Sequence, residues 1–240
     1  MTGRAAGRPQ RVDLHNHTHH SYDAQLRPAD YRRAHEAGLV DVVAITDHNT
    51  ITGALELREQ VPFPVIVGQE IDTADGELIG LFLTEPVPAG LPALETAERI
   101  RAQGGLVYLQ HPFYRLVRGR MRAAAREELR GRGLIDVVEA VNGGPLTGAA
   151  NARALAWARA CDLPHTASSD AHEPLGIGTC VQIVPAGPVD AGTLPGLLRA
   201  GRMIDARPPA ALAFGVKAAG RVATAVRAMA GREPVKRRRP

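Results

Sequence analysis

RVDLHNH, residues 11–17, begins as a short predicted strand and ends in two histidines, His15 and His17. The same arrangement returns in Thr46-Asp47-His48, Gln110-His111-Pro112 and Ser169-Asp170-Ala171-His172, and Glu70 follows a further apolar run over 65–67. In a barrel of alternating strands and helices, the C-terminal ends of parallel strands converge on one mouth. The repetition therefore predicts an α/β fold with imidazoles and carboxylates gathered at one end.

The rest of the chain alternates between two kinds of segment. Eight stretches, mostly β-branched or continuously apolar as in a covered parallel sheet, are predicted strands: 11–14, 42–46, 64–67, 78–83, 106–110, 137–141, 165–168 and 181–184. Six stretches rich in Ala, Leu, Glu and Arg are predicted helices: 28–37, 52–60, 92–103, 121–130, 148–160 and 189–200. This alternation predicts an α/β barrel or a doubly wound sheet. Asp75-Gly76 adds a predicted hairpin, which pairs 78–83 antiparallel with 65–70.

Composition limits the class of protein. The 240 residues are 45% hydrophobic, which is enough for a large core, and only 4% aromatic, so aliphatic side chains must fill it. No apolar run approaches the roughly 18 residues of a membrane span, and residues 1–11 lack the apolar segment of a secretory signal. Cys161 and Cys180 are the only cysteines, which favours free thiols and a cytoplasmic location.

The basic charge is concentrated near the C-terminus. The formal net charge is +4, but eight basic residues and one acid lie from Lys217 to Arg239. The remaining residues carry 21 basic against 24 acidic side chains, a net charge of −3. We therefore expect a barrel over 1–206 and an Ala- and Arg-rich appendage over 207–240. Its basic end is typical of a solvated tail, and weak binding to nucleic acid is the alternative.

The first two clusters contain residue types that bind metals. Because His15 and His17 are two residues apart, both imidazoles face the same side of an extended strand end and can chelate one ion. Asp23 follows in the same loop, where a solvated or capping role is the alternative. Asp47 and His48 stand together at the next strand end, so that one can bind an ion while the other orients a neighbour. Asp47 can instead cap the following helix.

The later clusters add carboxylates. Glu70 has two oxygens and can bridge two ions, which a neutral imidazole cannot. Glu77 lies across the predicted hairpin and either completes the shell of the second ion or faces solvent. His111 ends an apolar run, and Asp170 and His172 repeat the spacing of the first pair. Oxygen and nitrogen ligands together favour zinc, manganese or iron over calcium, with magnesium as an alternative.

Taken in order, these motifs resemble the PHP family, named for its polymerase and histidinol phosphatase members, and its smaller phosphoesterase branch. The resemblance runs from about Val12 to Ile204. It implies a distorted seven-stranded β/α barrel, a (β/α)7 barrel, with two or three divalent ions. The ligands that it implies are His15, His17, Glu70 and Asp170 for the first ion, Glu70 and His111 for the second, and Asp23, His48 and His172 for the third.

Three positions depart from the family pattern. Many relatives have a histidine where this chain has Glu77, a change that alters the charge of the site. Relatives often carry an acid after His-Pro-Phe, where this chain has Tyr114. An arginine tends to follow the position of Asn142, where this chain continues with Gly143-Gly144-Pro145. The last two departures bear on substrate contacts rather than on the metal ligands.

Hydrolysis of a phosphate ester of a small molecule or nucleotide is the predicted reaction. A bound ion lowers the pKa of water from 15.7 to about 7 and so supplies hydroxide at neutral pH. Arg115 and Arg118 are predicted to grip phosphate, with a solvated loop as the alternative, and His19 is a further predicted substrate contact. Asp47 or His172 is the predicted proton donor to the leaving group.

Two other kinds of protein share some of these features. A barrel hydrolase of C–N or C–O bonds commonly uses a carboxylated lysine as its bridge, but Lys217 and Lys236 are the only lysines and both lie in the expected appendage. A non-catalytic module, stabilised by metal and binding nucleic acid through its tail, is the other alternative. The body of the chain lacks an aromatic and basic track for a long strand, which favours a small substrate.

Overall fold

The computed structural model describes residues 7–114 and 119–207. The predicted substrate contacts Arg115 and Arg118 lie outside the described residues, as does the expected appendage from residue 208 onward. Arg207, the first residue assigned to that appendage, packs against the barrel. Its guanidinium donates to the carbonyl oxygens of Asn142 and Gly144, at 3.1 Å each, and to the Thr147 hydroxyl.

One mixed sheet organises the described residues. Its order is β7-β6-β5-β4-β3-β2-β1-β8-β9. The strands β1 to β3 run parallel, as do β5 to β7, whereas β4 is antiparallel to both of its neighbours and β8 is antiparallel to β1 and β9. The strands are β1 (Gln10–Asp13), β2 (Val42–Ile45), β3 (Val65–Thr73), β4 (Gly76–Leu81), β5 (Leu106–Leu109), β6 (Val137–Asn142), β7 (His165–Ser168), β8 (Cys180–Val184) and β9 (Arg202–Asp205).

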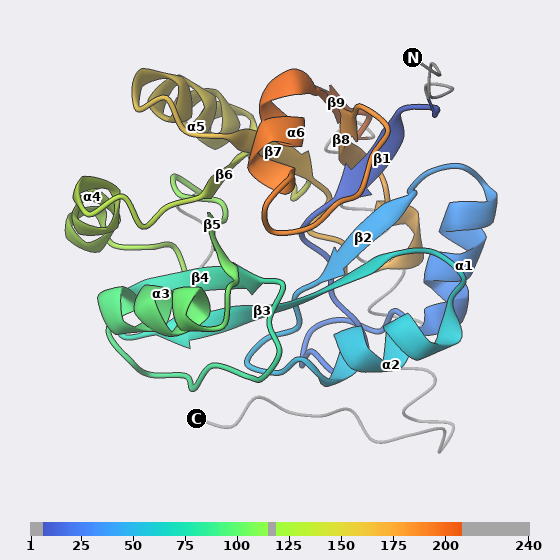
Figure 1. Cartoon of the computed structure of the whole chain (residues 1–240), viewed down its shortest axis with the longest axis horizontal. Helices are drawn as coiled ribbons and strands as arrows, with labels where there is room; N and C mark the ends of the chain where they lie inside the picture. The colour runs from blue at the N-terminus through green and yellow to red at the C-terminus, as the bar shows by residue number, and fades with distance from the viewer. Residues whose placement is uncertain (1–6, 115–118, 208–240) are drawn as a thin grey trace, which may run out of the picture.

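The sheet curves until it nearly closes into a barrel, because β7 also lies against β8 and β9 (Figure 1). The predicted α/β barrel class is confirmed. The helices surround the sheet: α2 packs on β2 and β3, α3 on β4 and β5, α5 on β6, and α6 on β7 and β8. Their bounds are α1 (Pro28–Glu36), α2 (Thr52–Gln60), α3 (Ala93–Ala102), α4 (Ala123–Gly131), α5 (Gly148–Ala160) and α6 (Leu194–Ala200), with a short 3-10 helix, η1 (Pro174–Gly176).

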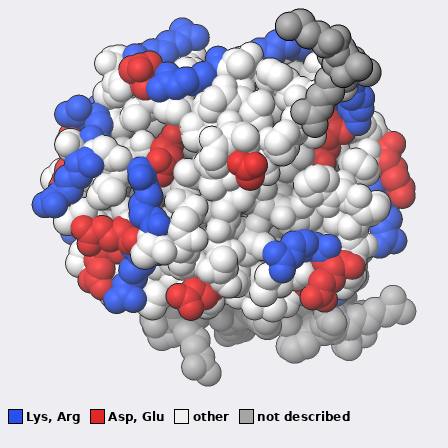
Figure 2. Space-filling view, viewed as in Figure 1, with Lys and Arg blue, Asp and Glu red and all other residues white. Residues whose placement is uncertain are grey.

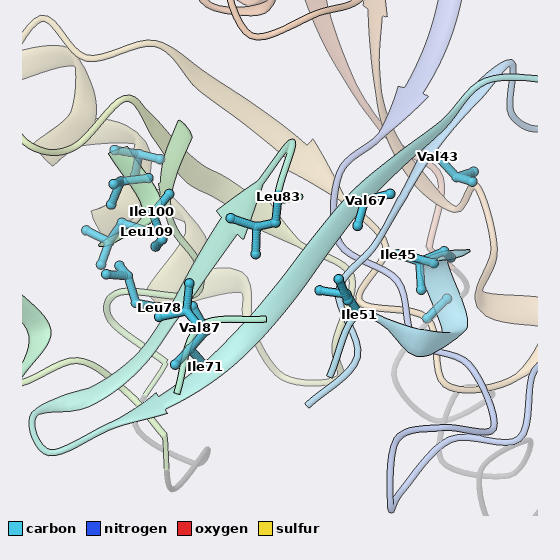
Figure 3. Close-up of a cluster of buried hydrophobic side chains, with 14 of the residues drawn as sticks. Val43, Ile45, Ile51, Val67, Ile71, Leu78, Leu83, Val87, Ile100 and Leu109 are labelled. Carbon is cyan, nitrogen blue, oxygen red and sulfur yellow. The ribbon is translucent and has the colours of Figure 1, made fainter. Parts of the chain in front are cut away.

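Two apolar layers follow from the alternation of side chains along each strand. Val43 and Ile45 of β2 face outward into the larger cluster under the helices, of which Figure 3 shows the part around β3 and β4. Val42 and Ala44 of the same strand face inward into a second cluster. This inner cluster fills the barrel floor and also contains Tyr108, whose hydroxyl reaches the polar residues above it.

Three details qualify the sequence prediction. The hairpin is confirmed, since β3 and β4 pair antiparallel with Asp72 opposite Glu77. The last helix begins at Leu194 instead of residue 189, and β9 was not predicted. Within residues 7–114 and 119–207, none of the helices is both long and apolar enough to cross a bilayer.

Candidate metal centre

The strand ends place the predicted ligands around one point. His15 and His17 follow β1, His48 follows β2, His111 follows β5, and Asp170 follows β7. Two isolated backbone bridges continue the parallel pairing past the strand ends, from Asn16 to Ala171 and from His48 to Glu70. All the predicted ligands except the exposed Asp23 are at least partly buried, and the His15 and His17 side chains are wholly inaccessible. We divide them into three ligand groups.

The first group consists of two histidine nitrogens that each lie close to the same two carboxylate oxygens. His15 Nε2 lies 3.2 Å from His17 Nε2, 3.4 Å from Glu70 Oε2 and 3.5 Å from Asp170 Oδ1. His17 Nε2 lies 3.4 Å and 3.3 Å from the same two oxygens. An ion bound at 2.0–2.1 Å in a tetrahedron has ligands about 3.3–3.4 Å apart. Each nitrogen is therefore spaced from the other nitrogen and from both oxygens as ligands of one ion are.

The second group shares Glu70. Glu70 Oε1 lies 3.2 Å from His111 Nε2, and the same nitrogen lies 3.8 Å from Glu77 Oε2. The two Glu70 oxygens thus point toward different groups, which is the geometry that a bridging carboxylate requires. His48 Nδ1 lies 3.5 Å from the other Glu70 oxygen, Oε2.

The third group lies nearer the surface. Asp23 Oδ2 is 3.4 Å from His172 Nε2 and 3.6 Å from His48 Nε2. His48 therefore faces the shared Glu70 through Nδ1 and Asp23 of the third group through Nε2. The His17 ring lies between His48 and His172, with centroid distances of 4.9 and 4.3 Å. The three groups are consequently parts of one continuous cluster.

Outer hydrogen bonds set which nitrogen of His15 and of His172 faces the cluster. His15 Nδ1 lies 3.0 Å from the buried Glu139 carboxylate, and His172 Nδ1 lies 2.9 Å from the backbone oxygen of Asp170. Since both partners accept only, each Nδ1 carries the proton. Each Nε2 then directs a lone pair into the cluster, as a metal ligand must.

Asp47 orients His17 in a similar way, through the hydroxyl of Ser21. Its carboxylate accepts from the Thr18 amide and hydroxyl, both at 2.6 Å, and from the Ser21 hydroxyl at 2.7 Å. Because Ser21 donates to Asp47, it must accept from His17 Nδ1, 3.1 Å away. Asp47 is fully buried, and its hydrogen bonds place it outside the cluster as a support for His17.

Four supporting residues were absent from the sequence prediction: Glu139, Tyr108, Asn142 and Gln110. Glu139 also accepts from the Tyr108 hydroxyl, the His111 amide and Asn142 Nδ2, at 3.1, 2.8 and 2.9 Å. Asn142 donates to Asp170 Oδ2 at 3.1 Å, which leaves Oδ1 for the first group. Gln110 donates to Glu70 Oε1 at 3.0 Å. The one signal in the sequence was a glutamate inside an otherwise apolar strand, Val137-Val138-Glu139-Ala140-Val141.

Electrostatics shows that the cluster requires positive charge. Burial alone would lower the histidine pKa values, but Glu70 and Asp23 raise the pKa of His48 to about 10. Burial also lowers the pKa of His15, but the nearby carboxylates of Asp170, Glu139 and Glu70 outweigh burial and raise this pKa well above its usual value. Burial and the neighbouring Glu70 raise the pKa of Glu77 to about 7. In the metal-free protein, protons on these groups offset the negative charge of the carboxylates. Bound divalent cations would offset the same charge in the metal-loaded protein.

Two ligand candidates have strained backbones. His111 and Asp170 adopt φ values of 28° and 51°, in the left-handed region that non-glycine residues rarely enter. Such residues cost on the order of 1–3 kcal/mol each and persist where the surroundings hold them. The His111 amide is held by Glu139, and the Asp170 amide donates to the His15 oxygen at 2.9 Å. The strain therefore falls where it aims side chains at the cluster.

His19 lies beside another carboxylate. Its Nε2 is 3.7 Å from Glu56 Oε2, and His20 approaches the same oxygen at 2.7 Å. The predicted role of His19 in substrate binding therefore has no support from these contacts.

The comparisons with known proteins agree with this arrangement. Residues 148–203 match the family model described as PHP-associated. The protein called Uncharacterized protein MJ1587, from Methanocaldococcus jannaschii, is 40% identical over 116 residues, which are 43% of this chain and 68% of that protein. A two-domain protein containing a predicted PHP-like metal-dependent phosphoesterase, from Bacteroides vulgatus, superposes with a TM-score of 0.65 at 18% identity, over 82% of this chain and 65% of that one. The chain belongs to the PHP family.

A second solved structure with a similar fold is that of an endonuclease. It is the lesion-specific endonuclease PfuEndoQ from Pyrococcus furiosus, with a TM-score of 0.55 at 17% identity, over 82% of this chain and 57% of that one. At these identities the structural likeness shows the fold alone. The chain spans about two thirds of the length of MJ1587 and of the Bacteroides vulgatus protein.

Proposed function

We propose that this PHP protein is a phosphoesterase that holds two or three divalent ions in the three ligand groups. The observation that carries the proposal is the first group, because the Nε2 atoms of His15 and His17 lie 3.2 Å apart and each lies 3.3–3.5 Å from one oxygen of Glu70 and one of Asp170, as ligands of a single ion do. The mixed imidazole and carboxylate set suits zinc, manganese or iron. Bound divalent cations would lower the pKa of a coordinated water and offset charge on phosphoryl oxygens.

The residues of the chain divide the remaining work. His15, His17, Glu70 and Asp170 would hold the first ion, His111 and Glu77 with Glu70 the second, and Asp23, His48 and His172 the third. His172 is our candidate for moving a proton to the leaving group, because it is the ligand candidate of the third group whose imidazole lies partly exposed, at 19%. Asp47 would instead orient His17 through Ser21.

The surroundings of Glu77 favour a small substrate. A hollow of about 360 Å³ opens beside Glu77 and is bounded by the β3–β4 hairpin and by Arg120 and Arg122. Arg122 lies 3.5 Å from Asp75, whereas Arg120 is exposed at the rim. A guanidinium in this position would bind a phosphate or carboxylate group of the substrate.

Nucleic acid is the second candidate substrate, since PfuEndoQ shares the fold. The face shown in Figure 2 carries basic and acidic side chains interspersed around its edge, with a largely uncharged middle. Strand-binding proteins typically present a continuous positive groove instead.

The free thiols of Cys161 and Cys180 would suit a reducing, cytoplasmic setting.

Metal analysis followed by ester hydrolysis tests the proposal. The purified full chain, loaded with zinc, manganese, iron or magnesium, should release p-nitrophenol from a phosphate monoester or diester. His17→Ala should lose at least one ion and most of the turnover. His165→Ala, at the opposite end of β7 from Asp170, serves as the control and should keep both.

The outcomes separate the rival functions. Ion binding without hydrolysis of any phosphate ester would reject the phosphoesterase and leave the metal centre standing. Turnover of amides or lactones in its place would assign the chain to C–N or C–O chemistry. Full turnover in His17→Ala would place the reaction elsewhere in the molecule.

A further inference from the structure

A second cluster of metal-binding residue types lies outside the main centre. It consists of His19 and His20, in the turn that follows His17, and Glu56 on α2. One ring nitrogen from each histidine and one Glu56 oxygen lie within 4.8 Å of one another. We call these three residues the accessory cluster. It shares no residue with the three ligand groups.

The turn places two consecutive histidines on the same side of the chain. Neighbouring side chains on an extended strand point to opposite faces. Here the ring centroids of His19 and His20 are only 4.3 Å apart. The His19 amide donates to the Leu26 oxygen at 2.9 Å and the His20 amide to the Thr18 hydroxyl at 3.2 Å. The backbone is therefore fixed on both sides of the pair.

His19 lacks the hydrogen bonds that would explain its position. Nδ1 is buried without a partner among the described residues. Nε2 lies 3.7 Å from Glu56 Oε2, which is too long for a hydrogen bond. The ring is nevertheless turned toward the oxygen that His20 contacts at 2.7 Å. A cation between the three side chains would give Nε2 of His19 a partner.

We infer that the accessory cluster binds one divalent transition-metal ion, of the class of zinc, nickel or copper. Two imidazoles and one carboxylate make a donor set that suits these ions and leaves coordination positions open to water. The side chains of His19, His20 and Glu56 are 27%, 23% and 33% exposed, so ions can enter from solvent. A single carboxylate and this exposure make the site weaker than the main centre, which has several buried carboxylates.

The accessory ion would link two parts of the main centre's surroundings. The turn with His19 and His20 continues directly into Ser21, which supports His17, and into Asp23 of the third group. Glu56 belongs to α2, which packs on β2 and β3. Binding at the accessory cluster would therefore tie this loop to the wall of the barrel. The inference does not depend on the proposed reaction.

Equilibrium dialysis against Zn²⁺ with metal quantification tests the site in the full chain. Wild type should bind one more ion per chain than Glu56→Gln. His19→Gln should also bind one ion fewer. This variant keeps the His20–Glu56 hydrogen bond, so loss of the ion cannot be explained by loss of that hydrogen bond. Glu59→Gln makes the same charge change on an exposed position of α2 and should bind as many ions as wild type.

A crystal soaked in Zn²⁺ gives a direct answer. An anomalous difference peak between His19, His20 and Glu56 is expected, separate from the peaks of the main centre. Absence of this peak, or wild-type stoichiometry in folded Glu56→Gln and His19→Gln, would show that the cluster is only an ion pair joining the loop to α2. Neither result would alter ion binding by the main centre, so failure of the inference is distinguishable from failure of the proposed function.

Discussion

Glu139 supports both histidines that flank Glu70. Its carboxylate is buried in β6 and accepts hydrogen bonds from His15 Nδ1, the Tyr108 hydroxyl, the His111 amide and Asn142. Four donors offset the cost of burying a charge, which would otherwise be several kcal/mol. In return, one side chain fixes the His15 tautomer and the strained backbone of His111.

We therefore expect Glu139→Gln to weaken metal binding by about 10–100-fold, although Glu139 belongs to none of the ligand groups. The amide would present a donor to the His111 amide or to Asn142, both of which need an acceptor. Competition with a metal-sensitive chelator would measure the affinity, and circular dichroism would verify the fold. Glu59→Gln is the exposed control. Wild-type affinity in folded Glu139→Gln would contradict a supporting role.

Two roles of Asp47 can be told apart by experiment. The hydrogen bonds indicate that it supports His17 through Ser21, whereas its position beside His48 in the sequence suggested that it donates a proton. Because all three of its hydrogen bonds come from Thr18 and Ser21, Asp47→Asn should lower metal affinity through His17, by about 10-fold. The shape of the pH–rate profile should stay unchanged at saturating metal. Loss of one limb of the profile would restore Asp47 as the proton donor.

The two kinds of site residue differ in how visible they are in a sequence. His15, His48, His111 and Asp170 each follow an apolar run, so their common location could be predicted from the period of the fold. Glu139 sits inside β6, and its partners come from the ends of two other strands, β1 and β5, and from β6 itself. Such a residue is recognisable only once tertiary contacts show what pairs with its charge.

The β3–β4 hairpin brings a second carboxylate to the cluster. Asp72 pairs with Glu77 in the antiparallel register, so the start of β4 lies at the same end of the barrel as the end of β3. Gly76 has a φ of 124°, and a Cβ there would meet the backbone of Met121. The Glu77 amide donates to the Gly119 oxygen at 2.5 Å. The hairpin thus fixes Glu77 against the segment that begins at Gly119.

Gly119→Ala should disturb Glu77 without removing it. A Cβ at Gly119 would overlap the Glu77 carboxylate, whereas the backbone of Gly119 lies outside the left-handed region. We expect fewer ions bound at a given metal concentration, with the midpoint of thermal unfolding little changed. Gly131→Ala, where a Cβ meets nothing within 4 Å, is the matched control. Equal ion binding in both variants would remove Glu77 from the proposed second ion site.

Strands were easier to predict than their directions. The cores of eight strands were recognised from apolar runs, and Asp75-Gly76 indicated the reversal into β4. β8 follows β7 through η1 alone and runs antiparallel to β1, because no crossover helix returns the chain to the other end. β9 is a half-exposed edge strand paired only with β8, so its residues, Arg202–Asp205, show no apolar run.

The barrel as a whole separates an apolar floor from a charged mouth. Inward residues of β1, β2 and β3 form the floor, and Tyr108 marks the boundary because its ring packs in the inner cluster while its hydroxyl reaches Glu139 and Ser168. Charges at the mouth are shielded from water by the same walls. Their interactions are therefore stronger than at the surface, and the bound protons or cations matter to the stability of the whole fold.

Metal loading should stabilise the protein more at high pH than at low pH. In the metal-free protein the raised pKa of His48, about 10, contributes stability that is complete below the unfolded value of 6.5 and is lost as the pH rises through 10. The lowered pKa values of Glu70 and Asp170 contribute stability that is lost only in acid. Histidines must be neutral to bind ions, so metal affinity rises with pH over the same window.

The difference in unfolding midpoint between metal-loaded and metal-free protein should therefore widen from about pH 6 to about pH 9. Thermal unfolding followed by circular dichroism, at constant free metal concentration, measures this difference. Metal binding at pH 7 should also release protons, which calorimetry in buffers of different ionisation enthalpy detects. His48→Gln should narrow the pH dependence, because one strongly shifted proton is then absent. A midpoint difference independent of pH would mean that ions and protons do not compete for this cluster.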